Sequence, residues 1–159
     1  MTTQPVASTQ VEAERVVLRY ALMPVDGNGI AVATVSRMLD DGANGGRARV
    51  LAPGEQVPYG VAPVLVADTT LYAAKRVQEA LLRWGQMPRP WLVLVSDAPA
   101  RPVQDARFLI RGLENRLAGV ARVPYLPVLR AVTDADEALE YKDVRAAAEK
   151  LRTAMEKRS

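Results

Sequence analysis

The sequence predicts an α/β fold: an open, mostly parallel sheet of about five strands, with helices on both faces and a further helix at the C-terminus. Short apolar segments alternate along the chain with segments of helical periodicity, which is the order of elements in a parallel sheet with helical crossovers. Three of the apolar segments, 15–25, 63–70 and 91–99, are nearly continuous in hydrophobicity. We therefore expect these three strands to be buried on both faces of the sheet.

The first strand and the first helix flank a glycine turn. A run of mostly apolar and β-branched residues over 15–25 predicts the strand, and a proline ends it. After the turn, a helix is predicted over 30–39, where a glycine-rich segment stops it. Short apolar segments at 47–53 and 63–70 predict the second and third strands.

The second half of the chain continues the alternation. A helix over 71–84 precedes the fourth strand, 91–99, and a helix over 102–118 precedes a short fifth strand, 120–127. Both helices carry apolar residues at helical spacing, which predicts that one side of each packs on the sheet. The residues of these stripes are Val77, Leu81 and Trp84 in the first helix, and Ala106, Ile110, Leu113 and Leu117 in the second.

The chain is expected to form one domain. Residues 1–13 are polar and lack periodicity, which is typical of a flexible tail, and 14–133 should form the α/β domain. The segment 134–159 predicts a C-terminal helix packed on that domain. Its apolar stripe consists of Val144, Ala148, Leu151 and Met155. Since its alanines bury little area each, pairing with another copy in a homodimer is the alternative.

The composition excludes several kinds of chemistry. The chain of 159 residues has no cysteine and no histidine, which removes disulfides, the usual zinc sites and imidazole catalysis. It also has no apolar run near the roughly 20 residues that a membrane span needs, and its first residues lack the pattern of a signal peptide. We therefore expect a cytoplasmic protein without a membrane span.

The glycine turn at 26–29 has the position and part of the pattern of a phosphate-binding loop. In the pattern G-x-x-x-x-G-K-[ST], glycines expose backbone N–H groups to phosphate and the lysine supplies a counter-charge. Counted from Gly27, valine replaces the second glycine and alanine replaces the lysine. The residues that could still hold a nucleotide or another anion are Gly27, Asn28, Gly29 and Thr34. The alternative is a plain strand-to-helix turn, with Asp26 or Asn28 capping the helix.

Two carboxylates follow neighbouring apolar segments. Asp68 and Asp97 should lie at the carboxyl ends of the third and fourth strands, where together they could hold a magnesium ion. An aspartate directly after a strand also commonly caps the next helix or closes a turn. The sequence leaves both roles open.

Arginines gather in the segment 101–130, which carries an excess of positive charge. This segment is the best candidate for a surface that binds nucleic acid or an acidic partner. The candidate residues are Arg101, Arg107, Arg111, Arg116 and Arg122. The alternative is an ordinary solvated helix face, because no helix-turn-helix pattern accompanies these arginines.

The order of the elements and two short patterns resemble known proteins. The strand followed by a glycine turn and a helix, the pattern VSDAP at 95–99 and the pattern RVPYLP at 122–127 resemble ParA/MinD-like P-loop proteins. More closely, they resemble short uncharacterised proteins of actinobacterial plasmids and integrative conjugative elements. The resemblance covers about 16–129. It implies a cytoplasmic P-loop-like domain over 14–133 that serves a mobile element, but it does not imply ATPase activity, because the lysine of the loop is replaced.

These observations lead to one main functional hypothesis and two alternatives. The main hypothesis is a non-enzymatic scaffold or adaptor with a degenerate P-loop, which binds a protein or DNA partner in mobile-element maintenance or transfer and needs no cofactor. The first alternative is an active enzyme or switch that binds a magnesium nucleotide. The second is a DNA-binding module that uses the arginines of 101–130.

Overall fold

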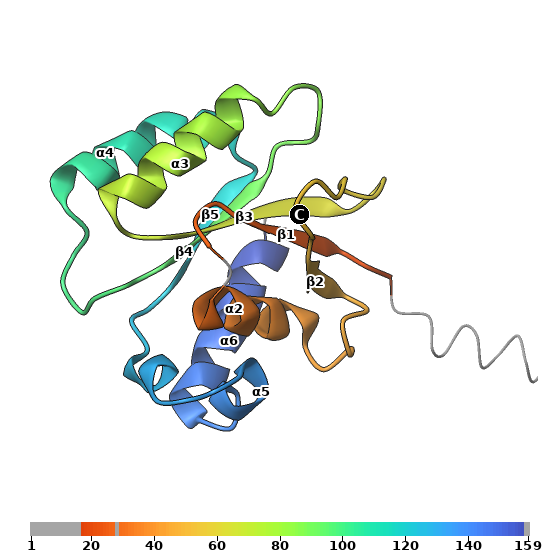
Figure 1. The fold of residues 1–159 in the computed structure, drawn as a ribbon, viewed down its shortest axis with the longest axis vertical. Coiled ribbons are helices and arrows are strands. Elements are labelled where there is room, and N and C mark those ends of the chain that lie inside the picture. The colour runs from red at the N-terminus through yellow and green to blue at the C-terminus, as the bar shows by residue number, and fades with distance from the viewer. Residues whose placement is uncertain (1–16, 28, 158–159) are drawn as a thin grey trace, which may run out of the picture.

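A computed structural model describes residues 17–27 and 29–157. Its centre is a five-stranded sheet in the order β2-β1-β3-β4-β5, in which every pair of neighbouring strands is parallel (Figure 1). The strands are β1 (Tyr20–Pro24), β2 (Ala48–Val50), β3 (Ala62–Asp68), β4 (Trp91–Val95) and β5 (Gly119–Val123). The predicted open parallel α/β sheet is therefore confirmed.

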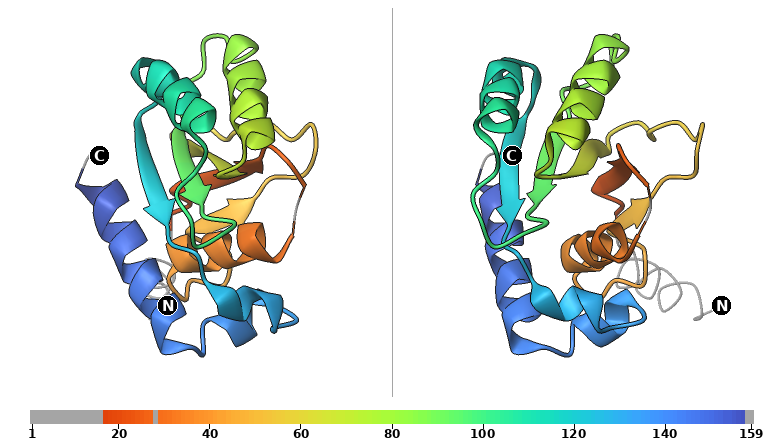
Figure 2. Two further views of the ribbon diagram at one scale, coloured as in Figure 1. Left: turned by 90° about the vertical axis from the view of Figure 1, so that its left-hand side faces the viewer. Right: turned by 60° about the vertical axis from the view of Figure 1, so that its left-hand side comes forward.

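Helices cover both faces of the sheet (Figure 2). One face is covered by α2 (Ile30–Asp40), α5 (Ala135–Ala138) and α6 (Lys142–Glu156), and the other by α3 (Leu71–Leu82) and α4 (Gln104–Leu113). The structure also has two short 3-10 helices. The first, η1 (Glu114–Arg116), follows α4, and the second, η2 (Pro127–Arg130), follows β5. The sheet thus separates two apolar layers.

The nearly continuous hydrophobicity of the central strands follows from these two layers. In β3, Val64 and Val66 pack in the layer of α2 and α6, whereas Leu65 and Ala67 pack in the layer of α3 and α4. Successive side chains of a strand point to opposite faces, so a strand covered on both sides needs apolar residues at every position. All five residues of β4 are buried for the same reason.

The strand order places a topological switch between β1 and β3. From β1 the chain crosses on the α2 face to β2, at one edge of the sheet, whereas from β3 it crosses on the α3 face towards β4. Loops that leave neighbouring strands in opposite directions open a crevice at the carboxyl ends of those strands, and ligands of open α/β sheets bind there. The fold therefore directs attention to this edge.

The predicted C-terminal helix is confirmed as α6, but it does not extend over 134–159 as one helix, because a separate short helix, α5, precedes it. A short α5 ends before Leu139, and α6 begins at Lys142. At about 100° per residue, a straight helix would turn Val144 roughly 120° away from Ala138, yet both side chains are fully buried in the same layer. The break at 139–141 lets both face the core. The predicted stripe of α6 is buried as expected: Val144, Ala148, Leu151 and Met155.

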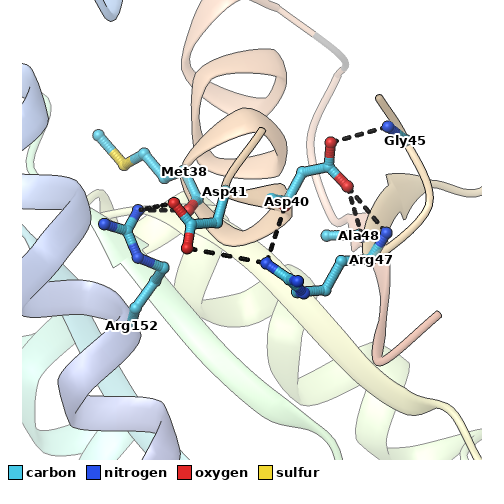
Figure 3. Close-up of polar contacts among 7 residues, drawn as sticks. All are labelled: Met38, Asp40, Asp41, Gly45, Arg47, Ala48 and Arg152. Atoms are coloured by element: carbon cyan, nitrogen blue, oxygen red, sulfur yellow. Dashed lines mark hydrogen bonds and ion pairs between the residues drawn. The ribbon is translucent and has the colours of Figure 1, made fainter. Parts of the chain in front are cut away.

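The C-terminal end of α2 is fixed by polar contacts around Asp40 (Figure 3). The side chain of Asp40 is 1% exposed and accepts three hydrogen bonds from backbone N–H groups of the following loop. The donors are Gly45 at 2.7 Å, Arg47 at 2.9 Å and Ala48 at 3.0 Å. Burial alone would raise the pKa of Asp40, but these donors and the charge of Arg37 hold the pKa below its ordinary value of 3.8.

A second contact joins the same end of α2 to α6. Arg152 donates a hydrogen bond of 2.8 Å to the backbone oxygen of Met38 and lies 3.7 Å from the carboxylate of Asp41 (Figure 3). Asp41 has a φ of 51°, so α2 ends on a left-handed residue. The C-terminal end of α2 is therefore fixed by two sets of contacts: those of Asp40 with the backbone that leads into β2, and those of Arg152 from α6.

Two further expectations concern the termini and the membrane. The predicted tail, 1–13, lies outside the described residues. Within 17–27 and 29–157, none of the helices combines the length and the apolar character that crossing a membrane requires.

Candidate functional site

A pocket of about 330 Å³ lies at the carboxyl edge of the sheet, beside the topological switch. Its floor and walls are apolar, and they come from α2, from the ends of β3 and β4, and from the segment after β5. The main apolar contributors are Val32, Val66, Val95, Leu126 and Leu129. Charged side chains line the rest of it: Asp26, Asp68, Asp97 and Arg130. The pocket thus combines an apolar interior with a predominantly negative lining.

The glycine turn brings the start of α2 to this pocket. Gly27 has a φ of 73°, a backbone conformation that favours glycine. Gly29 is the N-cap of α2 in an extended conformation, and no side chain of a described residue caps the first turn. Gly29 and the first two residues of α2, Ile30 and Ala31, line the pocket, so the N-terminal end of α2, with its partial positive charge, faces it. Asn28, another residue of the candidate anion site, lies outside the described residues.

Thr34 lies away from the pocket. It is in the second turn of α2, is 1% exposed and does not line the pocket. Its hydroxyl oxygen has no hydrogen-bond partner among the described residues. In the phosphate-loop pattern this position holds magnesium, but here α2 begins at Ile30, so the chain is already helical where the loop would surround a phosphate. The structure therefore brings Gly29 to the pocket and leaves Thr34 in the core.

Asp68 and Asp97 do line the pocket together, and each is also bonded to a neighbouring threonine. Thr70 donates to one oxygen of Asp68 through its backbone N–H at 2.9 Å and through its hydroxyl at 2.6 Å. Thr69 donates its hydroxyl to one oxygen of Asp97 at 2.6 Å. These bonds order the turn that leads into α3, where Thr70 is the N-cap. In each carboxylate they engage one oxygen, Oδ1, while the side chain also faces the pocket.

A metal site would need more ligands than these two. Among the described residues, no group of three or more acidic, cysteine or histidine side chains is arranged to hold a metal ion. Magnesium keeps several waters and often binds proteins through one or two carboxylates together with substrate phosphates. Asp68 and Asp97 could therefore hold it only with a ligand that completes its coordination.

The five candidate arginines come from different elements. Arg101 precedes α4, Arg111 lies on α4 and Arg116 lies in η1, and all three are exposed. The other two come together from different elements: Arg107 of α4 and Arg122 of β5 line a second, smaller pocket of about 20 Å³. Spacing along the sequence gave no sign of this convergence, because it depends on β5 lying beside β4.

The segment after β5 is the part of the site that the sequence analysis missed. Tyr125, Leu126, Leu129 and Arg130 close one side of the larger pocket. The available signal was a proline-flanked run of apolar residues directly after a strand, at the edge where ligands bind. Without the strand order, that run could not be assigned to the pocket rather than to a connection.

Comparisons with known proteins add no assignment: no family model, no curated protein and no solved structure matches this chain. The argument about function therefore depends on the site itself. Among the described residues that line the larger pocket there is no lysine, and the chain has no histidine or cysteine. The ionisable residues that line the larger pocket are three aspartates, one tyrosine and one arginine. These side chains suit recognition of a ligand through charge and hydrogen bonds.

Proposed function

We propose that this chain is a non-enzymatic scaffold or adaptor with a degenerate, ParA/MinD-like P-loop, which binds a protein or DNA partner in the maintenance or transfer of a mobile element. The partner favoured at the larger pocket is a protein. The proposal includes a cytoplasmic location and no resident cofactor.

The observation that carries this proposal is the lining of the larger pocket. Three acidic residues, Asp26, Asp68 and Asp97, line it together with a single basic residue, Arg130. A triphosphate would meet this excess of negative charge without the lysine of an active phosphate loop. A lysine or arginine side chain of a partner protein, in contrast, would place its apolar stem along the walls and its charge beside the carboxylates.

Titration with nucleotides tests the non-enzymatic part of the proposal. Calorimetry of the protein with ATP, ADP, GTP and GDP, each with and without magnesium, should show no binding at millimolar concentrations. Micromolar binding of any of them would overturn the idea of a degenerate loop, because it would show that the turn functions without its lysine.

Selection from a random peptide library tests the partner class. Selected peptides should carry a basic residue next to apolar residues, and they should bind Asp26→Asn and Asp97→Asn at least about tenfold more weakly. The control is Glu114→Gln, which removes an exposed carboxylate of η1 that does not line the pocket. Peptides without basic residues, or equal binding to all variants, would contradict the assignment.

A magnesium nucleotide remains the second candidate because one observation favours it. The start of α2, Asp68 and Asp97 line the same pocket at a topological switch, which is the usual place for a nucleotide in this class of fold. If this candidate is right, Asp68→Ala and Asp97→Ala should abolish a magnesium-dependent component of nucleotide binding.

DNA is the alternative partner, and it would use the arginines of 101–130 rather than the larger pocket. Its affinity should then fall steeply with salt concentration. Neutralising Arg111 should weaken binding, since Arg111 is exposed on α4.

The homodimer is a separate part of the proposal, and measurement of the molar mass in solution tests it.

A further inference from the structure

The smaller pocket brings together two arginines from different elements. Arg107 lies in the first half of α4, near the carboxyl edge, and Arg122 is the fourth residue of β5. Arg122 is in register with Leu94 of β4, whose side chain belongs to the layer of α3 and α4. The side chain of Arg122 therefore points to the face of α3 and α4, where it remains exposed on the edge strand, and both arginines line the same pocket.

Neither arginine is neutralised by a direct contact. No hydrogen bond or ion pair joins the side chain of Arg107 or Arg122 to another described residue, and the buried Nε of Arg107 has no partner among them. A buried guanidinium N–H without an acceptor costs free energy. Two guanidinium groups at one small pocket also repel each other. Both costs would be offset by a negatively charged acceptor between them.

The other polar side chains of the pocket are already engaged. Thr70 donates its hydroxyl to Asp68 and accepts a hydrogen bond from the N–H of Ala73 at 3.1 Å. Thr69 donates its hydroxyl to Asp97. The carboxylate of Asp68 lines the pocket too, so two positive charges and one negative charge face it. The donors left for a ligand are the two guanidinium groups, and the local charge favours an anion.

We infer that Arg107 and Arg122 form a binding site for a phosphate group, at the carboxyl edge of the sheet and beside the larger pocket, which shares only Asp68 with it. The volume of about 20 Å³ is enough for one water-sized atom, so one phosphate oxygen enters and the others stay at the mouth. Planar guanidinium groups suit such contacts because they present paired N–H donors to neighbouring phosphate oxygens. The site goes beyond the proposed function, since it needs neither a nucleotide nor a partner in the larger pocket.

Inorganic phosphate is the probe for this site. The amide signals of Thr69, Thr70 and Arg122 are followed by NMR as phosphate is added at constant ionic strength. We expect saturable shifts that fit one site, and about tenfold weaker binding in both Arg107→Gln and Arg122→Gln. Shifts that do not saturate, or that are the same in these variants, would overturn the inference.

Two further variants keep the test decisive. Arg116→Gln removes an exposed arginine of η1 that does not line the pocket, so its phosphate affinity should equal that of the unmodified protein. Arg107→Lys keeps the charge but loses the planar donor pair, and it should bind phosphate with intermediate affinity. Thermal unfolding of each variant identifies any that is not folded. If Arg107→Gln is unfolded, the result for Arg122→Gln decides.

A short duplex DNA distinguishes the two sources of the phosphate. For DNA, the logarithm of the binding constant falls linearly with the logarithm of the salt concentration. If the source is the DNA backbone, Arg107→Gln should make this negative slope less steep by about 0.9, the value of one phosphate contact. If the source is a small phosphate ester, the unmodified protein and Arg107→Gln should bind DNA with equal affinity. Inorganic phosphate should still bind more weakly to Arg107→Gln than to the unmodified protein. Failure of both arms would overturn the phosphate site and would leave the peptide test of the larger pocket unaffected.

Discussion

Substitution of Asp40 by asparagine should destabilise the protein without changing its fold. The side chain accepts hydrogen bonds on both oxygens, two on Oδ1 from Arg47 and Ala48 and one on Oδ2 from Gly45. Asparagine can keep the first two on its amide oxygen, but its NH₂ group would then face the N–H of Gly45. One hydrogen bond to a charged acceptor is lost and two become neutral.

The magnitude follows from these three bonds. A hydrogen bond to a charged group contributes about 1.5–3 kcal/mol and a neutral one about 0.5–1.5 kcal/mol. The three changes together would cost about 3.5–6 kcal/mol, and relief of burying the charged carboxylate offsets part of this cost, so we expect the free energy of unfolding to fall by about 3 kcal/mol. For a chain of this size, that corresponds to a melting temperature lower by about 6–12 °C. Urea unfolding at pH 7, followed by circular dichroism, measures the change.

Asp41→Asn is the matched control for this measurement. Asp41 is the neighbouring residue, its side chain is 53% exposed and its ion pairs with Arg47 and Arg152 are both 3.7 Å long. Asparagine tolerates the left-handed backbone of this position, and such exposed pairs contribute about 0–1 kcal/mol. If Asp40→Asn were no less stable than Asp41→Asn, the argument that the buried carboxylate orders this loop would be refuted.

The pH dependence supplies a second check with a definite sign. The pKa of Asp40 is lower in the folded chain than its ordinary value of 3.8, so its stabilising contribution is complete above that value. The contribution is lost as the pH falls through the folded-state pKa. The difference in stability between the unmodified protein and Asp40→Asn should therefore be constant from pH 5 to 7, taken as approximate limits of full ionisation, and should shrink below about pH 4.

Three other substitutions have expected outcomes. Gly119→Ala should lower the free energy of unfolding by about 1–3 kcal/mol in urea, because a Cβ at Gly119 would clash with the indole ring of Trp91. An unchanged unfolding midpoint would contradict this close packing. Thr34→Val should be neutral or stabilising by up to about 1 kcal/mol by the same assay, since it removes a buried hydroxyl without a partner; a clear loss would reveal a hidden hydrogen bond. The hydrogen bond from Arg49 lowers the pKa of Glu55 to about 2. In Arg49→Gln, the pKa of Glu55 measured by NMR titration should therefore rise towards 4.5. An unchanged pKa would exclude Arg49 as the cause.

The fold was predictable because its signal is spread along the chain. Strands such as 91–95 are apolar at every position, and helices such as α4 bury Ala106, Ile110 and Leu113 at helical spacing. These patterns follow directly from burial on two faces or on one. The break between α5 and α6 was not predictable in this way, because 139–141 contains neither glycine nor proline. It follows from the need to turn Ala138 and Val144 to the same layer.

The candidate site was predictable only in part, for a different physical reason. Asp68 and Asp97 were placed correctly at strand ends, since that position depends on local sequence alone. Thr34 was assigned by counting along a motif, and the count assumes a loop of fixed length, whereas the helix already begins at Ile30. The approach of Arg107 to Arg122 depends on the order of strands in the sheet, which no local pattern encodes.

The two ends of α2 have different roles, and this separates stability from recognition. Its C-terminal end is held by Asp40 and Arg152, whereas its N-terminal end has no side-chain cap from the residues that the structure describes and faces the larger pocket. Satisfied polar groups stabilise the fold, and groups without partners remain available for a ligand. The same contrast separates Asp40 from the two arginines at the smaller pocket. Asp40→Asn should therefore lower stability while leaving phosphate affinity unchanged at a temperature where the variant is folded. Arg122→Gln should lower phosphate affinity while leaving stability unchanged. If each variant lost both stability and phosphate affinity, the phosphate site would depend on the anchored end of α2.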